Sequence, residues 1–136
     1  MTRALQLAGW SLFAVLACGV VHTMVHAQEA EEAEKAREIV DVMHEAHLAP
    51  EGGTSLRDRV LSGKATAKER NQLLDIYISL TENEPPRGKL EDFQKKTNAV
   101  VLAAAKVVVG RKGAEAELRK ATTCAACHKD HKPPQQ

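Results

Sequence analysis

The chain has 136 residues, enough for one compact domain, with 19 Lys and Arg, 18 Asp and Glu, and 3% aromatic residues. The near balance of charges argues against a nucleic-acid partner recognised by bulk charge, and the aromatic residues are too few to stack bases. With so few large side chains the apolar core is thin, and a buried cofactor would supply the missing apolar volume.

The first 27 residues predict an export signal. They contain one basic residue, Arg3, and a long apolar run that ends in the small-residue sequence Val25-His26-Ala27. Two other interpretations stay open: the run is long enough to be retained as a membrane anchor, and Val15-Leu16-Ala17-Cys18 weakly resembles a lipoprotein cleavage box. All three place the domain of residues 28–136 outside the cytoplasm, so we expect a periplasmic protein that contacts a membrane only if the segment is retained.

Four helices are predicted in the exported domain, with one additional helical turn. Apolar residues recur at three-and-four spacing, turn residues separate the segments, and strand alternation is absent from the sequence after the signal. The predicted helices cover about residues 29–48, 66–80, 89–109 and 114–131, and the additional turn covers 55–61. The second helix begins with a Thr66–Glu69 capping box. Four helices with short links predict an all-α fold, an antiparallel four-helix bundle.

The motif richest in chemistry is Cys124-Ala125-Ala126-Cys127-His128. On a helix the cysteines and the histidine occupy positions i, i+3 and i+4, so their side chains share one patch of surface. This spacing suits a covalently attached haem c, one per chain, because two thiols can join the two vinyl groups while the imidazole binds the iron. A zinc site usually needs four protein ligands, with His131 the available fourth, and a thioredoxin-type disulfide needs a strand–helix unit. These two interpretations are disfavoured and stay open.

The motif lies on the last of four predicted helices, with Lys132 four residues after His128, and in this it resembles the cytochrome c-prime family. The resemblance covers residues 28–136 in helix order, with a specific sequence match only around the motif. It implies thioether bonds from Cys124 and Cys127, His128 as the proximal iron ligand, and a basic Lys132 near that ligand.

His131 departs from the family pattern, in which an apolar or aromatic residue is common at this position. It follows the proximal histidine by three residues on the same predicted helix, so it cannot reach the opposite face of the same haem. We expect a surface residue or a hydrogen-bond partner on the proximal side.

The residue on the other side of the iron decides between two functions that the resemblance implies. A methionine on the first helix gives a six-coordinate electron carrier, and an open apolar site gives a five-coordinate haem that binds NO or CO. Met43 lies about where the family places its distal residue, on an apolar stripe with Val40, and is a candidate distal ligand or ordinary core. His47, one turn later, is a second candidate or a charge at the helix end. His44 falls off the stripe and is predicted to be exposed.

We therefore expect an exported monohaem c-type cytochrome that transfers single electrons between exported redox partner proteins, with gas binding as the alternative. The sequence contains no recognisable nucleophile–base pair, phosphate loop or substrate-positioning array, so an enzyme in the usual sense is not expected. The resemblance also implies a homodimer as a candidate assembly.

Overall fold

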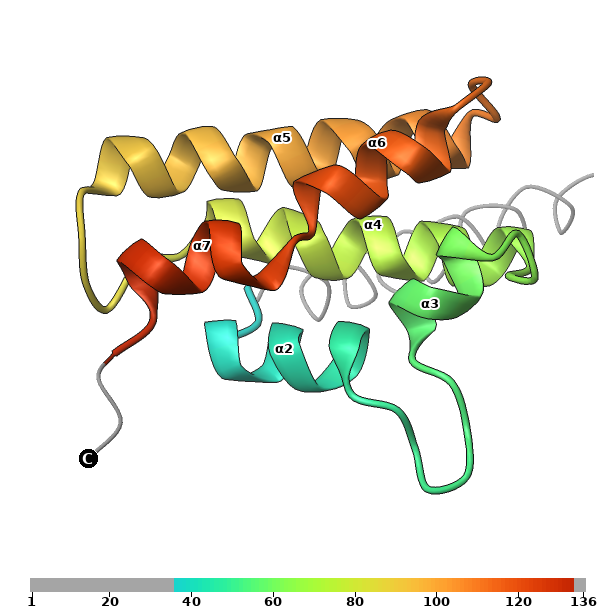
Figure 1. Ribbon diagram of the computed structural model, residues 1–136, viewed down its shortest axis with the longest axis horizontal. Helices are drawn as coiled ribbons and strands as arrows, with labels where there is room; N and C mark the ends of the chain where they lie inside the picture. Colours follow the sequence, from blue (N-terminus) through green and yellow to red (C-terminus); the bar gives the residue numbers. More distant parts are fainter. Residues whose placement is uncertain (1–35, 134–136) are drawn as a thin grey trace, which may run out of the picture. The chain divides into compact units, whose positions relative to one another are not determined.

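The computed structural model describes residues 36–133, and this part of the chain is all helical (Figure 1). Its helices are α2 (Ile39–His47), α3 (Leu56–Leu61), α4 (Ala67–Thr81), α5 (Leu90–Val108), α6 (Ala114–Ala121) and α7 (Cys124–His131). The predicted all-α class is confirmed. None of these helices combines the length and the apolar character that crossing a membrane requires. The predicted export signal lies outside the described residues.

Two helices begin where the sequence predicts, because local side chains satisfy their first backbone N–H groups. The Thr66 hydroxyl accepts a hydrogen bond from the Glu69 N–H at 3.2 Å, and the Glu69 carboxylate accepts from the Thr66 N–H at 2.8 Å. The predicted capping box at the start of α4 is thus confirmed. At α3 the Ser55 hydroxyl accepts from the Asp58 N–H at 3.1 Å.

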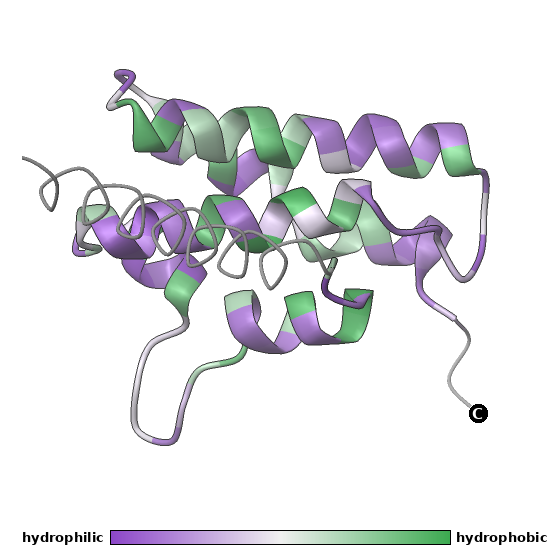
Figure 2. Ribbon diagram, turned by 180° about the vertical axis from the view of Figure 1, so that it is seen from behind, coloured by the Kyte–Doolittle hydropathy of each residue, from purple (hydrophilic) through white to green (hydrophobic). Residues whose placement is uncertain are grey.

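The core lies between α4, α5 and α6, with α2 and α3 packed against α4. Helices α4 and α5 lie side by side and run in opposite directions (Figure 1). The second half of α5 is mostly hydrophobic and its first half mostly hydrophilic (Figure 2). The fully buried side chains include Leu73, Ile76 and Tyr77 of α4 and Leu118 of α6. Helices α2 to α6 thus share one core, to which α7 contributes no residue.

Helix α2 turns a different face to this core from the one the sequence predicts. Val42 and Ala46 are fully buried, whereas Val40 is 52% exposed, so the predicted inward position of Val40 is wrong. Apolar residues form one broad continuous stripe on this short helix, and the pattern alone does not select which part of the stripe is buried. Met43 and His47 lie on the flank, where both are half-buried.

The predicted last helix is two helices, α6 and α7, separated at Thr122 and Thr123. Each threonine hydroxyl bonds a carbonyl of the preceding turn: Thr122 donates to Leu118 at 2.8 Å and Thr123 to Lys120 at 2.9 Å. Threonine side chains compete in this way with the helical backbone pattern. The break gives the Cys-His motif a short helix of its own.

Candidate functional site

Helix α7 carries both cysteines and the histidine of the motif, and most of its side chains are exposed to solvent. Cys124 and His128 are exposed and Cys127 is half-buried, and both cysteines are free thiols. Of the eight residues of α7, only His131 is buried. The structure therefore brings the three predicted anchoring groups together on one helix and leaves them accessible.

Electrostatic effects connect the three anchoring groups with ionisable side chains of other helices. Burial raises the pKa of Tyr77 on α4, and a negative charge on Cys124 adds to that rise. Burial likewise raises the pKa of Cys127, and the charge of Lys96 on α5 opposes it. A positive charge on His128 helps to lower the pKa of His47 on α2. Among the described helices, α5 is the one against which α7 packs through space.

The side chains of His47 and Tyr77 form a pair that links α2 to α4. The Tyr77 hydroxyl lies 3.4 Å from His47 Nε2, and the ring centroids are 5.8 Å apart. Burial, with the nearby charge of Arg57, lowers the pKa of His47 from 6.5 to about 4, so the imidazole is neutral at physiological pH. Sequence analysis did not single out Tyr77. The one indication in the sequence is that a tyrosine, whose hydroxyl needs a hydrogen-bond partner when it is buried, lies on the apolar face of a predicted helix.

Arg57 of α3 is a second residue that sequence analysis missed. Its Nε donates to the Thr122 hydroxyl at 2.9 Å, and its side chain is only 19% exposed. The charge of the same guanidinium helps burial to lower the pKa of His47, and it offsets part of the rise that burial causes in the pKa of Tyr77. The guanidinium also forms a salt bridge with Asp58 at 2.8 Å, so its positive charge is partly neutralised.

The candidate distal ligands lie on α2 and differ in their exposure. Met43 packs against the hydrophobic core from one flank of α2, one turn before His47. His44 is exposed, as predicted.

The residues after the motif differ in their surroundings. Lys132 is exposed at the end of α7, and its backbone N–H donates to the His128 carbonyl at 3.2 Å. His131 is buried, with 4% of its surface exposed, so the expectation of a surface residue is wrong. The alternative expectation, a hydrogen-bonding role, agrees with the contacts of its ring.

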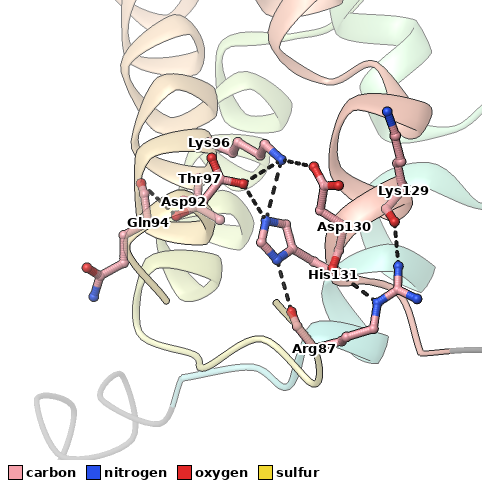
Figure 3. A network of polar contacts seen from close by, with 8 residues as sticks. All are labelled: Arg87, Asp92, Gln94, Lys96, Thr97, Lys129, Asp130 and His131. Atoms are coloured by element: carbon pink, nitrogen blue, oxygen red, sulfur yellow. Dashed lines mark hydrogen bonds and ion pairs between the residues drawn. The ribbon is translucent and has the colours of Figure 1, made fainter. Parts of the chain in front are cut away.

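Five residues make these contacts, and we call them the His131 clamp: Arg87, Asp92, Lys96, Asp130 and His131 (Figure 3). The ring Nδ1 lies 3.0 Å from the Arg87 carbonyl oxygen, and Nε2 lies 3.1 Å from Asp92 Oδ2. The Lys96 ammonium lies 2.8 Å from the Asp92 carboxylate and 2.7 Å from that of Asp130. Hydrogen bonds from Lys96 hold the pKa of both carboxyls below the usual range.

The same cluster has the composition of a metal site, because ligand atoms of Asp92, Asp130 and His131 lie within 4.8 Å of one another. The Lys96 ammonium, however, lies in contact with both carboxylates and supplies the positive charge that a metal would bring. The geometry is therefore that of a salt-bridge network.

The chain matches no family model, no curated protein and no solved structure in comparisons of its sequence and its fold. The site is accordingly interpreted from its own residues.

Proposed function

We propose that this protein is an exported monohaem c-type cytochrome that transfers one electron at a time. The observation that carries the proposal is the placement of Cys124, Cys127 and His128 on one accessible helix. Two thiols and an imidazole at i, i+3 and i+4 are what covalent haem attachment needs. Helix α7 packs against α5, and charges on the motif act on the pKa values of His47 in α2 and Tyr77 in α4.

The donor set fits this group better than it fits the alternatives. A zinc ion would need His131 as its fourth ligand, and the ring of His131 is engaged with Arg87 and Asp92. A thioredoxin-type disulfide would need an adjacent strand, and the part of the chain from residue 36 to residue 133 is helical without strands. Haem attachment uses the two thiols and the imidazole of α7 and needs neither a fourth protein ligand nor an adjacent strand.

The chain's own residues would divide the work. Cys124 and Cys127 would form the thioethers, and His128 would be the proximal iron ligand. Once bound, the haem supplies a ferric–ferrous couple. Met43 and His47 are the candidate distal ligands, on the same flank of α2.

The resemblance to the cytochrome c-prime family extends the proposal to the architecture and the setting. The antiparallel bundle would consist of α2, α4, α5 and the α6–α7 pair as its four helices, and α3 would belong to the connection between the first two. Lys132 would be the basic residue near the proximal ligand. The periplasm would be the location, exported redox proteins the partners, and a homodimer a candidate assembly.

Gas binding is the second candidate function, and one observation favours it. His47 already contacts the Tyr77 hydroxyl, and Met43 already packs against the core. If both keep these contacts, the iron has five ligands and an open position for NO or CO.

The test is the optical and EPR spectrum of the holoprotein, ferric and ferrous, with and without CO. Met43→Ala and His47→Ala are compared with the wild type, and the exposed His44→Ala serves as the matched control on α2. We expect the haem to remain attached to the denatured chain. We also expect a low-spin iron in the wild type that becomes high-spin and binds CO in either Met43→Ala or His47→Ala. A wild type that is already high-spin and binds CO would move the function to gas binding. A chain without covalent haem after expression in a maturation-competent host would refute the proposal.

A further inference from the structure

Helix α7 is attached to the rest of the domain almost entirely at its last turn. Among the described helices, α7 approaches only α5 through space, and its covalent connection to α6 is the non-helical pair Thr122-Thr123. It meets the hydrophilic first half of α5, where an apolar contact surface is scarce (Figure 2). The polar contacts of the His131 clamp therefore hold this helix in place.

The clamp fixes α7 from three directions. The ring of His131 is bonded to the Arg87 carbonyl in the α4–α5 connection, and its edge packs on Phe93 with ring centroids 5.4 Å apart. The carboxylate of Asp130 is bonded to Lys96 of α5. In return, the Arg87 guanidinium donates to the Asp130 carbonyl at 3.1 Å and also to the Lys129 carbonyl (Figure 3).

Gly88 shows how closely the α4–α5 connection approaches α7. Its φ of +86° lies in the left-handed region, which favours glycine. A Cβ at this position would lie 2.7 Å from His131 Nδ1 and 2.8 Å from the Asp130 carbonyl oxygen. Any side chain here would push the end of α7 away, so the α4–α5 connection packs closely against α7 at this point.

We propose that the His131 clamp positions the haem ligand His128 by fixing the roll and tilt of α7. His131 follows His128 by three residues, less than one helical turn, so a rotation of the helix at the clamp turns the ligand ring by the same angle. The orientation of an axial imidazole and its surroundings tune the electronic state of the iron. The proposal rests on the proposed function and names residues that act through His128 without contacting the haem.

The test uses the holoprotein with His131→Ala and His131→Asn. The readouts are the reduction potential and the iron–histidine stretching band in resonance Raman spectra of the ferrous protein. This band is recorded in the five-coordinate, high-spin form, so if the wild type is six-coordinate every protein compared also carries the distal substitution, Met43→Ala or His47→Ala. We expect His131→Ala to keep covalent haem but to shift and broaden the band and to change the ferric-to-ferrous ratio at a fixed ambient potential about threefold. The Asn variant retains an N–H near the position of Nδ1, so we expect it to restore most of the wild-type band.

A second pair of variants covers the case in which His131→Ala does not fold. Lys96→Ala removes both carboxylate contacts but leaves the ring on the Arg87 carbonyl, and it should shift the band in the same direction by a smaller amount. Lys95→Ala removes the same charge from an exposed neighbouring position and should leave the band unchanged. Folded, haem-bearing His131→Ala or Lys96→Ala proteins with wild-type band and potential would overturn the positioning role alone. A wild type without haem would overturn the proposed function and this inference together.

Discussion

His47 lies where a charged imidazole is unfavourable, and this makes stability depend on pH. The pKa of this residue is lowered to about 4 in the folded chain by burial and by Arg57, against 6.5 for the free side chain. Between these values the unfolded chain binds a proton that the folded chain does not. The contribution of His47 is therefore complete above pH 6.5 and is lost as the pH falls toward 4.

We expect this loss to amount to about 1 to 2 kcal/mol, since His47 is half-buried and solvent screens part of the effect. The measurement is urea unfolding at pH 7 and pH 5 of the haem-free Cys124→Ala/Cys127→Ala chain, with and without His47→Gln. The glutamine variant should lose less stability on acidification. An equal loss in both chains would show that His47 does not cause the effect, and the exposed His44→Gln serves as the control.

The residues of the site differ in how far the sequence could predict them. Cys124, Cys127 and His128 form one local group, because helical spacing alone brings them together. The partners of Tyr77 and Arg57 lie 30 and 65 positions away in the chain, so only the tertiary fold shows that Tyr77 meets His47 and that Arg57 meets Thr122. The role of His131 was equally hidden, since its contacts come from the α4–α5 connection and from α5.

At the scale of the element, the capping box of α4 should have a measurable effect on stability. Thr66→Ala removes the acceptor for the Glu69 N–H and leaves the Glu69 carboxylate bonded to the Thr66 backbone N–H and to Arg59. We expect a loss of about 1 kcal/mol in the free energy of unfolding. The measurement is urea unfolding of the holoprotein, followed by circular dichroism at 222 nm.

The control for this prediction is Lys68→Ala, an exposed position in the first turn that takes no part in the box. It should leave the free energy of unfolding within about 0.5 kcal/mol of the wild type. A Thr66→Ala protein as stable as the control would mean that the cap is replaced by solvent at no cost.

The starts of α3 and α4 were predictable because their signals, Ser55 and Thr66, are local. The start of the first helix was not, since residues 36–38 lie in the predicted helix and α2 begins at Ile39, and neither was the break in the last helix. The periodicity of Leu118, Ala121, Cys124 and Ala125 continues across Thr122 and Thr123, so the pattern alone predicts one helix. The break depends on the threonine hydroxyls and on Arg57, which reaches Thr122 from α3. The buried face of α2 was missed for a related reason, since partners on α4 select it.

At the scale of the whole molecule, the core is built mainly from small and aliphatic side chains. Among residues 36–133, the buried aromatic side chains of the phenylalanine and tyrosine type are Phe93 and Tyr77, and only Tyr77 belongs to the central cluster. A domain with so little large apolar surface gains much from a covalently held apolar group.

We accordingly expect the haem-free Cys124→Ala/Cys127→Ala chain to be less stable than the holoprotein by about 3 kcal/mol, or a melting temperature lower by about 15 °C. Thermal unfolding followed by circular dichroism measures the difference. Cys124→Ala alone keeps one thioether and should fall between the two. Identical melting temperatures for all three proteins would argue that the core is complete without haem.

The exposure of Cys124 at the start of α7 imposes an order on the events of maturation. A chain exported as proposed enters a compartment where thiols are readily oxidised. The same accessibility that lets the Cys124 sulfur reach a vinyl carbon lets it reach an oxidant or the thiol of a second chain. Each new molecule would thus face a competition in time between capture by haem and oxidation, and yields of mature protein would depend on the supply of reductant as much as on that of haem.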